Sequence, residues 1–280
     1  ATSFFTTANQ KIFINGQTPF AADRNGGTVG ANKSIGLNNG GQQIITSGNP
    51  YIIFNGSDTT IVEAAFTVND NPTIRTDNNT YSRDLIQGTG RFTKAGVSFL
   101  QLDNNAANTL SGGFDLVHSG TIIRQANATL GTGAVRMFAG SILSTPTLAN
   151  LGTTGLTQVR TSGSAMPSIG VRSSNIANFD AVSAAVAGVL SGNGNGILSI
   201  DGNATLNTEL AFATRDGGVF NNWFLGGGEG NGNFTRSNVA PWGNGSQFLI
   251  GGGSGTLTLN PAAVGAQFSG ANQLVLGAGM

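Results

Sequence analysis

An internal repeat is the feature that most constrains the fold of this 280-residue chain. Leu100 and Leu102, near the middle, align with Leu257 and Leu259, near the end, and a polar turn, a Ser-Gly pair and a second strand-like run follow both pairs. Residues two positions apart on a strand share a face, so each Leu-x-Leu run has one apolar face. A unit this short cannot bury that face alone, and copies of it must therefore stack.

The composition favours strands over helices. The chain has 44 glycines, and short runs of alternating apolar residues are separated by clusters of Gly and Asn. Gly and Asn favour turns, whereas Thr, Phe, Ile and Val favour strands. The 17 phenylalanines and the net charge of zero argue against a disordered chain. The predicted fold class is all-β.

One segment departs from this pattern. We predict a single solenoid over residues 1–280, with an irregular insertion at 145–196. Within the insertion, apolar residues recur at helical spacing from Ile176 to Leu190, which indicates a short helix. The same stretch is rich in Val and Ala and also fits a pair of strands, so both interpretations stay open.

Two parts of the chain, at residues 88–143 and 246–280, share a set of short strand-like runs. The runs are Gly90–Leu102, Asn108–Gly113, Gly120–Ile122, Leu130–Val135, Gly140–Leu143, Gly255–Leu259 and Leu274–Gly279. These runs resemble the autotransporter-associated β-strand repeat of long, secreted or surface-displayed bacterial passengers. The resemblance implies an architecture, a right-handed parallel β-helix (β-solenoid), and no activity.

This architecture makes physical sense of the pattern. Each coil of a β-helix pairs with the coils above and below it, about 4.8 Å away. Inward side chains stack into apolar ladders, and Gly and Asn supply the left-handed conformations of the corners. At about 20 residues per coil, the chain would make roughly 14 coils.

No catalytic, cofactor or metal site is predicted. The chain has no cysteine, and His118 is its only histidine, which removes most zinc and nucleophilic-triad chemistry. A β-helix carbohydrate-active enzyme is the least favoured alternative, because such enzymes need paired carboxylates and the Asp residues fit solvated turns better. The Asp pairs spaced by about one coil are Asp58 and Asp77, Asp84 and Asp103, and Asp180 and Asp201.

Aromatic residues gather between two Gly-rich loops. If exposed, they would stack on cell-surface glycans or on another partner, as in an adhesin-type passenger rod that is a fragment of a longer surface protein. If buried, they form core under a loop. The residues are Phe220, Trp223, Phe224 and Trp242. Balanced charge gives no case for nucleic acid, and no apolar run is long enough to span a membrane.

The ends of the sequence predict self-association. Phe4 and Phe5 lie in a strand-like start, whereas Leu274, Val275 and Leu276 lie in a final strand-like run, within 44 residues that carry no charge. Uncapped solenoid ends present unpaired strands that invite pairing. The primary prediction is a non-enzymatic, extracellular structural protein of the bacterial cell surface that forms a head-to-tail homopolymer, filament or matrix. The start at Ala1 fits signal cleavage or an excised fragment.

Overall fold

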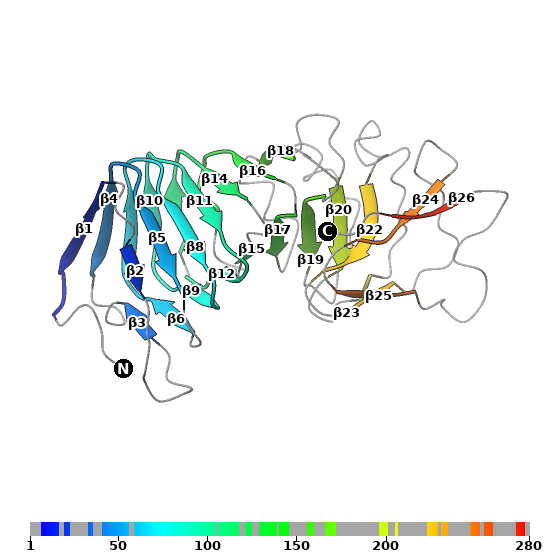
Figure 1. The fold of residues 1–280 in the computed structure, drawn as a ribbon, viewed down its shortest axis with the longest axis horizontal. Helices are drawn as coiled ribbons and strands as arrows, with labels where there is room; N and C mark the ends of the chain where they lie inside the picture. Colours follow the sequence, from blue (N-terminus) through cyan, green and yellow to red (C-terminus); the bar gives the residue numbers. More distant parts are fainter. Residues whose placement is uncertain are drawn as a thin grey trace. The chain divides into compact units, whose positions relative to one another are not determined.

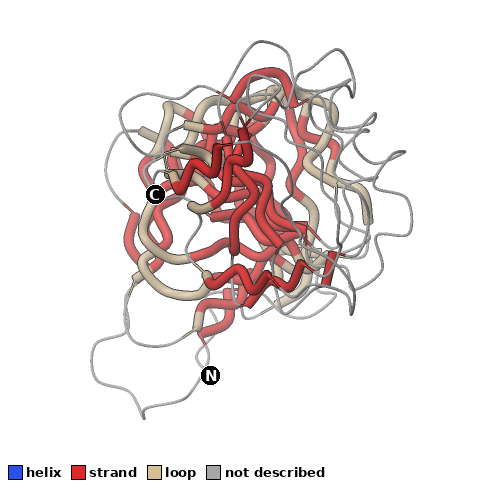
Figure 2. Tube along the Cα trace, turned by 90° about the vertical axis from the view of Figure 1, so that its right-hand side faces the viewer, coloured by secondary structure: helices blue, strands red, loops and turns tan. Residues whose placement is uncertain are grey.

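The chain is described by a computed structural model that places segments made of strands and loops. No helix occurs among these residues (Figures 1 and 2). The chain divides into two compact units, unit 1 (residues 1–135 and 153–155) and unit 2 (residues 136–152 and 156–280). The described residues are 7–16, 20–22, 33–35, 41–55, 59–104, 106–117, 121–124, 129–138, 140–145, 156–159, 166–171, 196–200, 205–206, 223–228, 231–234, 247–252, 255–259 and 273–277.

Unit 1 is a three-sided stack of five coils, each contributing one strand to each of three parallel sheets (Figure 1). The first sheet holds β1 (Lys11–Asn15), β4 (Gln43–Ser47), β7 (Ala65–Val68), β10 (Ile86–Gly88) and β13 (Thr109–Leu110). The second holds β2 (Phe20–Ala22), β5 (Tyr51–Phe54), β8 (Thr73–Thr76), β11 (Phe92–Ala95) and β14 (Phe114–Leu116). The third holds β3 (Lys33–Ile35), β6 (Thr60–Val62), β9 (Thr80–Ser82), β12 (Phe99–Leu102) and β15 (Thr121–Arg124).

The coils of unit 1 repeat at a nearly constant interval after the first. Thr60 pairs with Thr80 and Thr80 with Leu100, so the two steps along the third sheet are equal in length. The first coil is longer, because Lys11 on β1 pairs with Gln43 on β4. Because every pair of strands given a register is parallel, and each joins one coil to the next, the prediction of a parallel β-solenoid is confirmed.

Unit 2 also stacks parallel strands, with coils longer than those between β6 and β12. Ser168 pairs with Ile197, and Leu225 pairs with Ile250. The expected coil length, and with it the estimate of roughly 14 coils, is therefore wrong for this unit. One sheet holds β17 (Ile142–Thr145), β19 (Ser168–Val171), β20 (Gly196–Ile200), β22 (Trp223–Gly227), β24 (Gln247–Ile250) and β26 (Gln273–Leu276), and a second holds β21 (Thr205–Leu206), β23 (Asn231–Phe234) and β25 (Thr256–Leu259).

The range 145–196, expected as an irregular insertion, contributes a strand to the stack. β19 lies inside it and pairs with β17 on one side and β20 on the other. β18 (Leu156–Val159) also falls in this range, and its sheet neighbour is β16 (Val135–Met137). The expected helix over 176–190 lies outside the described residues.

Alternation along strands such as β4, β5 and β7 produces inward ladders in unit 1, whereas every residue of β20 in unit 2 is buried. Leu100 and Leu102 are 2% and 0% exposed, as the repeat predicts. Their counterparts Leu257 and Leu259 are half-buried, and they alternate with exposed threonines on β25. Aromatic rings form one column in unit 1, where the Phe92 ring lies 5.9 Å from that of Phe66 and 5.3 Å from that of Phe114.

Asparagine and glycine shape the corners. The side chain of Asn49 accepts a hydrogen bond from the backbone amide of Asn71 (3.0 Å), and the side chain of Asn71 accepts one from the amide of Arg91 (3.2 Å). Each corner side chain thus satisfies a backbone donor of the next coil. Asn49 itself has a positive φ of 54°, the left-handed conformation that Asn tolerates.

Candidate functional site

The predicted aromatic patch is only partly described, and Trp223, one of its two tryptophans, is buried. Trp223 is 1% exposed and pairs with Gly196 across β22 and β20. A Cβ atom on Gly196 would lie 2.8 Å from the indole ring, so the glycine leaves room for that ring. The interpretation of Trp223 as an exposed stacking residue is therefore wrong. Phe224 is half-buried, and Phe220 and Trp242 lie outside the described residues.

The predicted assembly strand β26 does present apolar side chains. It pairs with β24, with Leu274 beside Phe248 and Leu276 beside Ile250. Phe248 and Ile250 are 2% and 7% exposed, whereas Leu274 and Leu276 are 52% and 76% exposed. The leucines lie beside the buried residues of β24, and no strand lies beyond them among the described residues. Val275, between them, is half-buried.

Strand β1 is an edge strand of the first sheet of unit 1 among the described residues. It pairs with β4, and no other described strand pairs with it. Phe13, on its outward face, is 70% exposed, while Ile14 is buried. Phe4 and Phe5, which we expected to contribute here, lie outside the described residues.

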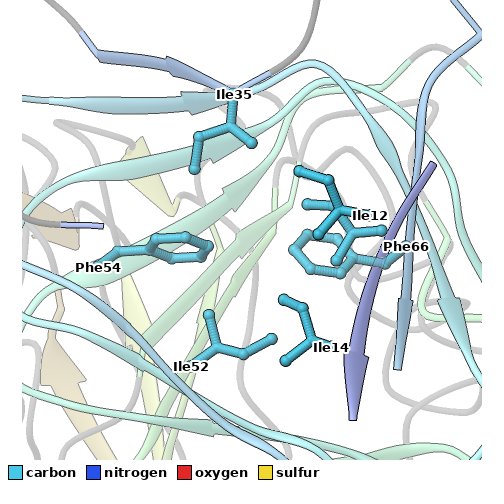
Figure 3. Close-up of a pocket in the computed structure, with 7 residues that line it drawn as sticks. Ile12, Ile14, Ile35, Ile52, Phe54 and Phe66 are labelled. Atoms are coloured by element: carbon cyan, nitrogen blue, oxygen red, sulfur yellow. The ribbon is translucent and has the colours of Figure 1, made fainter. Parts of the chain in front are cut away.

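A small apolar cavity lies in the core beside β1 (Figure 3). Its volume is about 10 Å³, and every lining residue is apolar. Such a space holds at most a single water molecule, whereas a ligand pocket is at least an order of magnitude larger and carries polar groups. The cavity is a packing gap, and it offers no site for a substrate. Its lining residues are Ile12, Ile14, Ile35, Ile44, Ile52, Phe54 and Phe66.

The described carboxylates of the candidate pairs are engaged in structural contacts. Asp103 lies 3.6 Å from the guanidinium of Arg83, which also lies 3.5 Å from Glu63, so three successive coils share one charge ladder. Asp84 accepts a hydrogen bond from the amide of Leu85 (2.7 Å). Asp77 pairs with Arg75 at 2.7 Å, and Asp58, Asp180 and Asp201 lie outside the described residues.

A buried lysine is a titratable core residue that the sequence did not lead us to expect. Lys94 is 0% exposed and points inward from β11, where it pairs with Ile74 and Leu116. Its Nζ donates hydrogen bonds to the carbonyls of Ala95 (2.6 Å) and Ser98 (2.9 Å). Burial lowers the pKa of Lys94 to about 7, and the negative charge of Asp77 opposes this shift only in part. Alternation with Phe92, two positions earlier, could have placed it inside.

Metal-ligating side chains do not gather in the described part of the chain. No group of three or more His, Asp or Glu side chains there could hold an ion. The absence of a metal site stays a prediction for the whole chain. In the same part of the chain, no helix has the length and hydropathy needed to cross a membrane.

Comparisons with known proteins add no relative. No family model, curated protein or solved structure matches the chain. The fold and the edges described above are therefore the basis for any functional proposal.

Proposed function

We propose that this chain is a non-enzymatic structural β-solenoid of the bacterial cell surface that joins copies of itself end to end. The observation that carries the proposal is the exposure of Leu274 and Leu276 at ladder positions of β26. In the preceding strand the same positions are buried, so one more coil stacked on β26 would remove both leucines from water.

Strand β1 is a second edge strand that a further copy could pair with. β1 has a free parallel edge among the described residues, with Phe13 exposed and Ile12 half-buried. A strand edge supplies unpaired backbone donors and acceptors to any strand that stacks on it. The net charge of zero, and the lack of charge from residue 237 onward, remove the usual electrostatic resistance to association.

The extracellular setting rests on the sequence. The resemblance to autotransporter-associated repeats and the absence of cysteine both favour a surface or matrix protein. The adhesin alternative, in which an aromatic patch binds glycans, lacks an exposed Trp223. We therefore favour a scaffold role over a binding role.

Sedimentation velocity over a range of concentrations tests the end-to-end contact. We expect the unsubstituted chain to form larger species as concentration rises, and Leu276→Lys to weaken this association about tenfold or more, because a buried leucine contributes about 1.5–3 kcal/mol. Val97→Lys is the matched control, because Val97 is also 76% exposed but lies on a corner of unit 1. It should associate as the unsubstituted chain does.

Two results would contradict the proposal. One is a monomer at every concentration. The other is association that Leu276→Lys leaves unchanged, which would place the contact on a lateral face of the sheets.

A further inference from the structure

Among the large, fully buried side chains described in unit 1, Lys94 is the one that can carry a charge. It occupies a ladder position that Ile52, Ile74 and Leu116 fill in neighbouring coils. A lysine here costs free energy as a cation, because an ammonium group loses its hydration when it enters an apolar core. Burial at this position therefore favours the neutral form of the amine over the ammonium form.

The hydrogen bonds of Lys94 match a neutral amine. A neutral amine has two N–H groups, and the two carbonyl acceptors, Ala95 and Ser98, both lie on the corner that joins β11 to β12. The third N–H of an ammonium group would find no acceptor among the described residues. The Ser98 carbonyl also accepts from the Thr76 hydroxyl (2.8 Å), and the Ser98 amide donates to the Thr76 carbonyl (3.0 Å), so the corner is tied to the coil before it.

The charged side chains around Lys94 form ion pairs with one another. On the preceding coil, Arg75 pairs with Asp77 at 2.7 Å. On its own and the following coil, Arg91 pairs with Asp115 at 2.9 Å. The described inward side chains of the other two sheets in these coils carry no charge, and no carboxylate forms a hydrogen bond with the amine.

We propose that the closed fourth coil holds Lys94 as a neutral amine, so that opening of the corner at residues 95–98 takes up one proton. The corner then acts as a pH-sensitive latch inside the solenoid. Opening exposes the amine to water, where it regains the proton affinity of an ordinary lysine.

The direction of the pH effect follows from the two proton affinities. The closed form has a pKa of about 7, and the open form has the ordinary value of 10.5. Between these values the open form binds one more proton, so opening becomes about tenfold more favourable for each pH unit that the solution is lowered. Below about pH 7 both forms carry the proton, and the effect levels off.

Hydrogen exchange of the Ser98 amide tests the latch, because that amide closes the corner onto Thr76. Expressed as a protection factor, its protection should fall about tenfold per pH unit from about pH 9.5 to about pH 7.5. Lys94→Met, which keeps the side chain long and removes the amine, should abolish this slope. Lys11→Met, at an exposed position of β1, should retain it.

A protection factor that does not vary with pH, or a slope that persists in Lys94→Met, would overturn the proposal. If Lys94→Met does not fold, NMR titration of the Lys94 side chain in the unsubstituted protein decides instead. A midpoint near 7 supports the neutral amine, and a midpoint near 10.5 refutes it.

Discussion

At the scale of single residues, a comparison of two corner glycines distinguishes the cost of a left-handed backbone from the cost of a steric clash. Gly16 and Gly96 have nearly the same φ, +92° and +91°. A Cβ atom on Gly96 would lie 2.3 Å from the Thr76 carbonyl oxygen, whereas one on Gly16 would meet nothing within 4 Å. The close stacking of coils, and the left-handed conformation, thus both require glycine at position 96.

Alanine at the two positions should therefore cost different amounts. We expect Gly16→Ala to lower the free energy of unfolding by about 1 kcal/mol, the cost of the left-handed conformation, and Gly96→Ala by about 3 kcal/mol, because the neighbouring coil must also move. Urea unfolding of both variants checks this. Equal losses would mean that the corner relaxes without cost.

Alternation along the strand correctly predicted the burial of Leu100 and Leu102. The predictions failed for two residues that were judged by residue type and not by their position on a strand. Lys94 was overlooked as a core residue because lysines are rarely buried, although it shares a face with Phe92. Trp223 was considered for the surface, although its ring fills the space that Gly196 leaves. On the strands of unit 1 that alternate, such as β4 and β5, the face of the strand decides burial.

At the scale of elements, the inward ladders of unit 1 hold the coils together. Phe92 is fully buried between Phe66 and Phe114, whereas Phe99 lies half-buried on the outer face, with its ring 5.5 Å from that of Tyr81. Substitutions at these two positions therefore compare a phenylalanine in the core with one on the outer face of the same coil.

We expect Phe92→Ala to lower the free energy of unfolding by about 3–5 kcal/mol, because it leaves a cavity in the column of rings. Phe99→Ala should cost about 1 kcal/mol, the value of one exposed edge-to-face pair. Thermal and urea unfolding measure both. A loss for Phe99→Ala as large as that for Phe92→Ala would contradict the inward assignment of the ladder.

Coil length was predictable only where the corners are short. The expected spacing holds through β6, β9 and β12, where Thr60, Thr80 and Leu100 follow one another in register. In unit 2 the paired residues lie further apart along the chain, and the extra residues obscure the repeat in the sequence. β19 went unrecognised for this reason, because its short run Ser168–Val171 stands between long stretches without strand periodicity.

At the scale of the whole molecule, the edge strands of the parallel sheets matter for function, because their unpaired backbone groups can pair with a further strand. A strand was expected in the final run of the sequence, and β26 lies there, with Leu274 and Leu276 exposed. Its role in assembly stays a prediction. Phe13 on β1, which is 70% exposed, was not among the residues expected to take part in assembly. The surface location and the family resemblance stay predictions.

Fibre diffraction from oriented assemblies of the purified chain tests the central claim most directly. If copies stack end to end as continuous solenoids, every strand lies across the filament, and the spacing between coils repeats along its axis. We predict a strong reflection at about 4.8 Å along the filament axis. A reflection of this spacing perpendicular to the axis, or a chain that forms no assemblies, would contradict the account.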